Sequence, residues 1–114
     1  MQVEMLAADA HIEDKPVPEM ASVSAAYALR KANGYLTKHV GMFFGAVEPV
    51  YVLEDAPLWQ VTVNFQMYDI GPFTLGTLDV DALTGEVCPY SESKIQAILR
   101  RTNAIVKRYS PSAA

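Results

Sequence analysis

One stretch of this 114-residue chain constrains the fold most, because its apolar and polar residues alternate without a break. It reads LWQVTVNFQMY and spans residues 58–68. A period of two sends successive side chains to opposite faces of a β-strand, so one set enters a core and the other faces outward. The apolar set is Trp59, Val61, Val63, Phe65 and Met67, and the polar set is Gln60, Thr62, Asn64 and Gln66. We therefore predict a half-buried strand with one open face.

Strand and turn signals flank this stretch on both sides. Residues 50–53, VYVL, are β-rich and follow Pro49, which suits a strand start or an edge strand. Turns are predicted at residues 55–57 and at DIGP, residues 69–72. FTLGTLDVDAL then predicts a third strand, in which Gly76 marks a bulge or a close backbone approach. Short connections of this kind are typical of an antiparallel meander.

An alanine-rich segment before these strands has helical periodicity. Apolar residues recur at helical spacing over residues 19–39, and Pro18 suits a first helical turn. Asn33-Gly34 is a plausible C-terminal stop, yet the apolar stripe continues beyond it. We predict a helix to about residue 39 and leave open whether it bends at Gly34.

A second helix is predicted after the strands, over residues 91–108. Its isoleucine, leucine and valine residues fall on one face, so the helix is amphipathic. Ser93 and Gln96 fit a capping box, and Ser91 is the alternative N-cap. The predicted fold class is α+β: an N-terminal helix, an antiparallel three- to four-stranded meander and a C-terminal amphipathic helix, with helices on one face of the sheet.

The chain is long enough for one hydrophobic core, so we predict a single domain over residues 19–110. Residues 1–18 read as a flexible acidic lead-in, and residues 111–114 as a tail. The net charge of -4 is uneven, because residues 1–20 are acidic and residues 92–114 are basic. These two regions can attract each other, within one chain or between two, or the basic region can face an anionic partner.

The cysteine content bears on the compartment. Cys88 is the single cysteine, which excludes an internal disulfide and favours a reducing compartment. The N-terminal residues do not resemble a signal peptide, and no apolar run approaches the roughly 18 residues of a membrane span. We therefore expect a cytoplasmic protein, in which Cys88 is a small buried hydrophobic residue.

Three carboxylates lie close together in GTLDVDALTGEV, residues 76–87. Asp79 and Asp81 share the outward face of the third strand, and Glu86 follows the turn. Turn geometry explains the pattern, because Asp81 can accept backbone N–H bonds, Thr84 can do so weakly and Gly85 can take a positive φ. A metal site or a catalytic pair is the alternative, but the EF-hand spacing is missing and an exposed turn does not separate two carboxyl pKa values.

Other candidate chemistry is weak. His11 and His39 have no Cys, Asp or Glu neighbour at ligand spacing, and the glycines form no phosphate-binding loop. We expect no metal, no cofactor and no catalytic residues.

The strand motifs carry a resemblance to a known family. WQVTV from Trp59, followed by GTLDVDALTGEV from Gly76, resembles the PepSY-type pattern of a tryptophan-led strand, a hairpin and a strand ending V-D-x-x-T-G-x-V. The resemblance covers about residues 20–88, including the alanine-rich helix. It implies a cystatin-like helix-on-sheet fold and a role in binding or inhibition rather than catalysis. The chain is also similar to small uncharacterised prokaryotic proteins with the same two motifs and one following helix.

The polar set of the central strand is the first candidate partner surface. Gln60, Thr62, Asn64 and Gln66 are nearly uncharged, whereas a fully solvated sheet face commonly carries Lys and Glu. A three-stranded meander also has two edges that need protection. We predict a homodimer formed through the sheet, by face or by edge, and a module that binds an unidentified protein or peptide, with strand addition as its natural mode.

Two further functions stay open. The exposed face of the second helix carries Arg100, Arg101, Lys107 and Arg108, which suit a small regulatory or antitoxin-like protein that contacts nucleic acid. A small-ligand-binding or enzymatic α+β domain would instead have a pocket between helix and sheet, near Tyr27, Tyr35 and Trp59. No membrane partner is expected.

Overall fold

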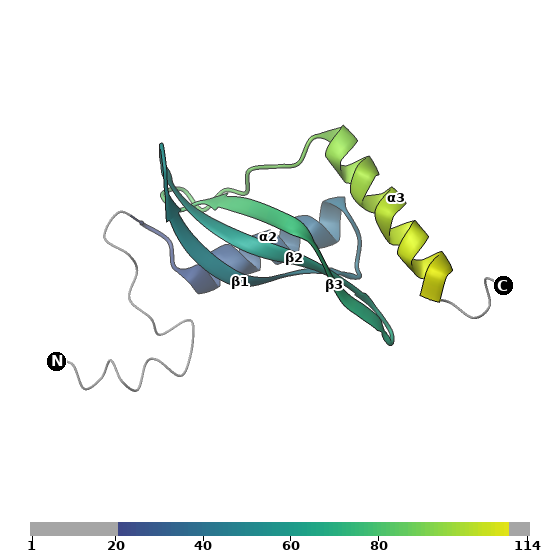
Figure 1. Cartoon of the computed structure of the whole chain (residues 1–114). Coiled ribbons are helices and arrows are strands. Elements are labelled where there is room, and N and C mark those ends of the chain that lie inside the picture. Colours follow the sequence, from purple (N-terminus) through teal and green to yellow (C-terminus); the bar gives the residue numbers. More distant parts are fainter. Residues whose placement is uncertain (1–20, 110–114) are drawn as a thin grey trace, which may run out of the picture.

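The structure, a computed structural model, describes residues 21–109, so the predicted lead-in and tail lie outside the described residues. Its elements are helix α2 (Ala25–His39), strands β1 (Phe44–Leu53), β2 (Pro57–Met67) and β3 (Ile70–Asp81), and helix α3 (Glu92–Tyr109). The strands pair antiparallel in the order β1-β2-β3 (Figure 1). In the sequence, one helix precedes the three strands and the other follows them. The predicted α+β fold is confirmed.

Strand β2 occupies the centre of the sheet, and its alternation is the one read from the sequence. Trp59, Val61, Val63 and Phe65 are buried, while the residues between them are half-buried on the other face. Across β2 and β3, Trp59 pairs with Val80 and Val61 with Leu78, so the buried residues of the two strands share one face. The bulge expected near Gly76 is present, because the register shifts after the Val63–Gly76 pair.

Strand β1 is longer than predicted. It begins at Phe44 rather than at Val50, because the segment before Pro49 also pairs with β2. The two halves are separated by a bulge in which Glu48, with φ 54°, and Pro49 have no register partner. Because the bulge and its proline interrupt the alternation of apolar and polar residues, the sequence pattern did not predict the first half of the strand.

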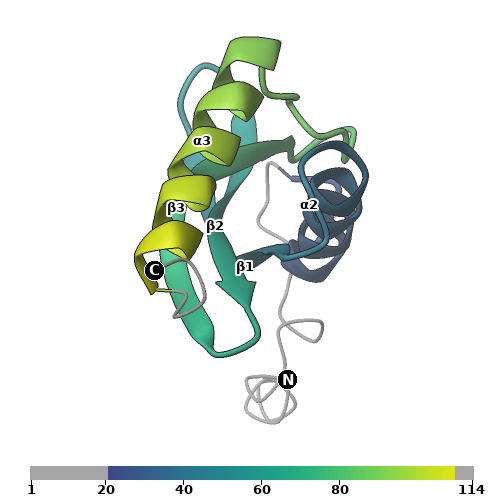
Figure 2. The same ribbon diagram turned by 90° about the vertical axis from the view of Figure 1, so that its right-hand side faces the viewer.

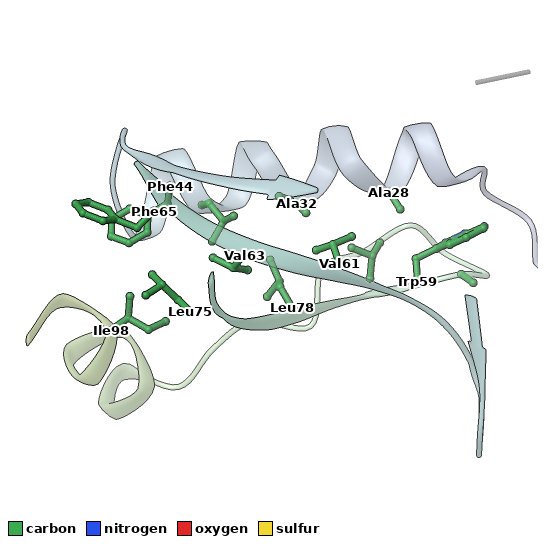
Figure 3. Close-up of a cluster of buried hydrophobic side chains, with 14 residues drawn as sticks. Ala28, Ala32, Phe44, Trp59, Val61, Val63, Phe65, Leu75, Leu78 and Ile98 are labelled. Atoms are coloured by element: carbon green, nitrogen blue, oxygen red, sulfur yellow. The ribbon is translucent and has the colours of Figure 1, made fainter. Parts of the chain in front are cut away.

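The core is one cluster between the sheet and the helices (Figure 3). Helix α2 contributes small residues, Ala28 and Ala32, which let it lie close to the sheet, and the larger Leu36. Helix α3 contributes Ile98 to the same cluster. The sheet residues of the cluster are Phe44, Ala46, Trp59, Val61, Val63, Phe65, Leu75, Leu78 and Val80. Both helices therefore bury their apolar residues on the same side of the sheet.

Helix α2 begins later than predicted. Residues 21–24 are not helical, because the N–H groups of Ser22 and Val23 donate to the Ala82 carbonyl (2.7 and 3.1 Å). The Ser24 side chain then accepts from the Tyr27 N–H and caps the helix. The prediction of a start near residue 19 is wrong for this reason, although residues 19 and 20 themselves lie outside the described residues.

The predicted end of α2 near residue 39 is confirmed, and the helix runs through Gly34. Asn33 and Gly34 are therefore not its C-terminal stop. Instead, the N–H groups of Val40 and Gly41 both donate to the Leu36 carbonyl (2.9 and 2.8 Å) and close the last turn.

Helix α3 starts through the alternative cap. Ser91 Oγ accepts from the Lys94 N–H (3.1 Å), which makes Ser91 the N-cap. The predicted Ser93–Gln96 capping box is wrong, because the Gln96 side chain donates to the Glu92 carboxylate instead (3.0 Å). Neither of the helices described is both long enough and apolar enough to cross a membrane.

Candidate interaction surface

The face of the sheet that points away from the core is not covered by a helix of residues 21–109. Both helices contribute to the cluster on the opposite face. Figure 2 shows α2 beside β1 and α3 beside β3. We call the uncovered side the open face. Its members are Gly45, Val47, Val50, Val52, Leu58, Gln60, Thr62, Asn64, Thr74, Thr77, Asp79 and Asp81.

The middle of the open face is polar and largely uncharged, as the alternation of β2 predicts. Gln60, Thr62 and Asn64 are half-buried there by their neighbours on β1 and β3. The Gln60 amide donates to Asp79 Oδ1 (3.4 Å), and the Thr74 hydroxyl donates to Asn64 Oδ1 (3.2 Å). Gln66, the fourth predicted residue, is exposed at the end of the strand.

Apolar residues border this polar centre on the β1 side. Val50 is 56 % exposed and lies opposite Gln60, and Val52 lies opposite Leu58. Near the start of β1, a shallow hollow of about 330 Å³ opens between β1 with the two residues before it, β2 and the start of β3. Its lining residues are Met42, Phe43, Phe44, Gly45, Val47, Asn64, Gln66 and Pro72. A surface with exposed apolar residues and few charges is typical of protein interfaces.

The outer edge of β3 is closed by the chain that follows it. The Asp81 N–H donates to the Glu86 carbonyl (2.8 Å), and the Asp79 carbonyl accepts from the Cys88 N–H (2.9 Å). Val80 and Val87 form an isolated antiparallel bridge at the same place. Residues 86–88 therefore act as a short fourth partner for the end of β3, which removes that edge as a site for strand addition.

Two further carbonyls of the β3 edge accept hydrogen bonds from side chains. The Tyr90 hydroxyl donates to the Thr77 carbonyl (2.7 Å), and the Arg101 guanidinium reaches the Leu75 carbonyl (3.5 Å) from α3. The Tyr90 N–H in turn donates to Tyr35 Oη on α2 (2.9 Å). Tyr90 thus links the β3 edge to α2, and Arg101 links it to α3.

Burial, together with smaller contributions from the nearby Tyr35 and Asp79, raises the pKa of Tyr90 to about 12. The Tyr90 hydroxyl therefore keeps its proton up to high pH and remains a donor to Thr77.

The candidate carboxylate cluster forms a turn in the structure. Asp81 Oδ1 accepts from the N–H groups of Leu83 (2.7 Å) and Thr84 (3.1 Å), and the Thr84 hydroxyl accepts from the Glu86 N–H (3.1 Å). Gly85 has a φ of 82°, which favours glycine. Within residues 21–109, no three His, Cys, Asp or Glu side chains are grouped so that they could hold a metal ion.

Cys88 is exposed, so the prediction of a buried residue is wrong. The strand pattern ends before it, and residues 86–88 run along the β3 edge rather than into the core. Partial burial raises the pKa of the Cys88 thiol, and the carboxylates of Asp79 and Asp81 raise it further. A raised pKa keeps the sulfur in its less nucleophilic thiol form.

The four basic candidates of α3 are all exposed. Arg101 bonds to the β3 edge, and the Arg108 guanidinium lies over the Tyr109 ring, 6.0 Å from its centroid. Arg100 and Lys107 complete the set. More generally, every Lys and Arg of residues 21–109 lies in a helix, and every Asp and Glu of that range except Glu92 lies in a strand or a loop. This separation by secondary structure was not recognised in the sequence.

No cavity lined by residues 21–109 alone brings together the three aromatic residues of the ligand-pocket prediction. Trp59 is buried, and its indole N–H donates to the Val23 carbonyl (2.9 Å). Tyr27 is exposed and lies beside Arg30. Tyr35 lines an open hollow of about 410 Å³ between α2 and residues 86–87. Its other lining residues are Arg30, Lys31, Gly34, Lys38, Glu86 and Val87.

Comparison with protein-family models, with curated proteins and with solved structures gives no significant match. The resemblance to the PepSY-type pattern therefore stays a prediction.

Proposed function

We propose that this protein is a non-enzymatic interaction module that binds another polypeptide through its sheet. The observation that carries the proposal is the open face, whose β2 residues Gln60, Thr62 and Asn64 are polar and uncharged, and which has an apolar border on the β1 side and no covering helix among residues 21–109. A sheet face that is meant only for solvent normally carries charge, whereas interface centres are depleted of it. A PepSY-like role in binding would agree with this function.

We further propose that two copies of the chain associate through the open face. The Asn64 and Thr74 side chains there already bond to each other, so this neutral pair can be buried with few groups left unpaired, whereas Asp79 lies toward the β3 side of the face. The apolar border around Val50 and Val52 supplies surface to remove from water. We also propose a cytoplasmic location, because a single cysteine fits a reducing compartment.

Light scattering behind a sizing column tests the association directly. At micromolar concentration we expect a mass of about 25 kDa, twice the 12.5 kDa of one chain, at low and at high salt. Thr62→Arg puts a charge in the middle of the open face, and we expect it to give a monomer. The matched control is Thr37→Arg, because Thr37 is exposed on α2. A wild-type monomer, or a dimer that both variants leave intact, would contradict association through this face.

A second candidate function is supported by the separation of charge. Because all lysines and arginines of residues 21–109 lie in helices, the helical side has a positive field that suits phosphate groups. Binding of a duplex oligonucleotide that weakens steeply with salt, and further in an Arg100→Gln, Lys107→Gln double variant, would favour this reading. No binding at 50 mM salt would exclude it.

A further inference from the structure

The two halves of the outer β1 edge differ in what lies against them. In the first half, the Ala46 N–H donates to Asn33 Oδ1 (2.9 Å), and the Asn33 amide donates to the Leu29 carbonyl (2.9 Å). This part of the edge is therefore occupied by α2. The bulge follows, with Glu48 at φ 54° and Pro49, which has no N–H. An incoming strand cannot pair with β1 before Val50.

In the second half of β1, from Tyr51 to Leu53, the hydrogen-bond alternation shows which backbone groups point outward; we call this part the free edge. The Pro57 carbonyl accepts from the Ala82 N–H at β3 (3.0 Å), so the backbone of Pro57 faces β3. In an antiparallel ladder the direction alternates along the strand, so Leu58 and Gln60 face β1, where Val52 and Val50 are their partners. Tyr51 and Leu53 consequently point their N–H and C=O groups away from the sheet.

No described residue bonds to these outward groups of Tyr51 and Leu53. They present two donors and two acceptors in the spacing that an added strand requires. Val50 and Leu53 are also 56 % and 55 % exposed, one on each face of the strand. The free edge therefore offers main-chain bonds together with apolar side chains on both faces.

Three acidic residues of the β1 strand and the turn after it flank the free edge. Glu48 lies at its start, and Glu54 and Asp55 lie at its end, in the β1–β2 turn; all three are exposed. Within residues 21–109, every lysine and arginine lies in α2 or α3 and none lies in a strand. Like charges at both ends disfavour self-pairing of two β1 edges, because an antiparallel copy would bring acidic ends together.

We propose that the free edge, Tyr51 to Leu53, binds an extended basic peptide segment as a fourth strand beside β1. The segment has apolar residues at alternate positions, next to Val50 and Val52, and Lys or Arg at its ends, next to Glu48 and to Glu54 and Asp55. This inference rests on the proposed function and names the partner's chemistry. The open face remains available to a second copy while the edge is occupied.

Three blocked peptides test the proposal: Arg-Val-Thr-Val-Thr-Val-Arg and the versions with Gln or Glu in place of both Arg. Each is titrated into the full ¹⁵N-labelled chain, and amide shifts give affinity and location. We expect the Arg peptide to bind about tenfold more tightly than the Glu peptide at low salt, to shift the Tyr51 and Leu53 amides, and to lose most of its advantage in 0.5 M NaCl.

Two variants locate the effect. Leu53→Pro removes an outward N–H and no bond to β2, and we expect it to weaken binding at least about fivefold. Glu54→Gln with Asp55→Asn leaves the backbone intact and should cut the preference for the Arg peptide. Asp69→Asn, in the β2–β3 turn, is the matched control and should change nothing.

Each failure has its own meaning. If the three peptides bind equally at the edge, the basic partner is overturned and the proposed function stands. If no peptide shifts Tyr51 or Leu53, the edge is not a peptide site, and the mass measurement still decides association through the open face. If Leu53→Pro converts a dimer into a monomer, a second copy occupies the edge and the peptide proposal is overturned.

Discussion

The two edges of this sheet differ in how many of their outward backbone groups have hydrogen-bond partners. At β3, the carbonyl or N–H groups of Leu75, Thr77, Asp79 and Asp81 are each bonded by residues that follow in the chain. At β1, protection ends at the bulge, and the last residues of the strand keep their outward groups free of described partners. Edge strands attract other chains unless they are blocked, so a block on one side makes the other the place for association.

Helix α3, which brings Arg101 to the β3 edge, is held in place by Ile98, and the largest expected effect comes from shortening this residue. Ile98 is 6 % exposed in the core cluster, so Ile98→Ala should lower the free energy of unfolding by about 2–4 kcal/mol. Urea unfolding measures this loss. Ile95→Ala, at a half-buried site on the same helix, should cost clearly less. Equal costs would show that α3 has no specific anchor at Ile98.

The turn that returns the chain along β3 can be weakened by itself. Asp81→Ala removes the acceptor of two backbone N–H groups and should cost about 1–2 kcal/mol. Hydrogen exchange of the Cys88 amide, which bonds to the Asp79 carbonyl, should accelerate. Asp79→Ala is the control, since its carboxylate has only a 3.4 Å contact with Gln60. Unchanged exchange in Asp81→Ala would show that the bond between Cys88 and Asp79 does not depend on this turn.

The hydrogen bond from the Tyr90 hydroxyl to the β3 edge can be removed by itself. Tyr90→Phe should cost about 0.5–1.5 kcal/mol at pH 7, because the bond to the Thr77 carbonyl is lost. The raised pKa also predicts a pH dependence. Above about pH 10 the unfolded chain releases this proton before the folded chain does, so wild-type stability should fall as pH rises from about 10 to about 12.

Chemical denaturation across this pH range, in parallel for the wild type and for Tyr90→Phe, isolates the contribution of Tyr90 from that of the other tyrosines. The variant should show a shallower fall. A fall of the same steepness in both proteins would mean that Tyr90 titrates normally.

The smallest effect is expected at the β1 edge. Tyr51 packs edge-on against Trp59, with ring centroids 5.5 Å apart, and its buried hydroxyl has no hydrogen-bond partner among the described residues. Tyr51→Phe keeps the ring and removes the unpaired group, so stability should change by less than about 0.5 kcal/mol or rise by up to about 1 kcal/mol. Thermal unfolding measures the difference. A loss above 1 kcal/mol would reveal a partner for the hydroxyl.

The sheet was largely predictable, because periodic burial leaves a periodic sequence. The central strand has a polar residue between each pair of core residues from Trp59 to Phe65, and its neighbours follow short turns. The first half of β1 was missed because Gly45 and the bulge at Glu48–Pro49 interrupt any alternation. The α2 start was misplaced because Pro18 suggested a first turn, whereas Ser24 supplies the side-chain cap.

The candidate site was predictable only in its polar set. Gln60, Thr62 and Asn64 follow from alternation, and they occupy the open face. The closed edge was not predictable, because Tyr90 meets Thr77 and Tyr35 across long stretches of chain and no local pattern records such contacts. Cys88 was placed in the core for the same reason, since residues 86–88 pair with β3 without the alternation of a buried strand.

The separation of charge between helices and strands also has a kinetic consequence. Residues 21–109 carry equal numbers of acidic and basic side chains, yet the two signs sit on different elements, so this part of the chain has an electric dipole without net charge. Such a dipole turns an approaching charged molecule before contact and raises the rate of productive encounters at low ionic strength. A cationic partner would therefore arrive facing the strands, and an anionic one facing the helices.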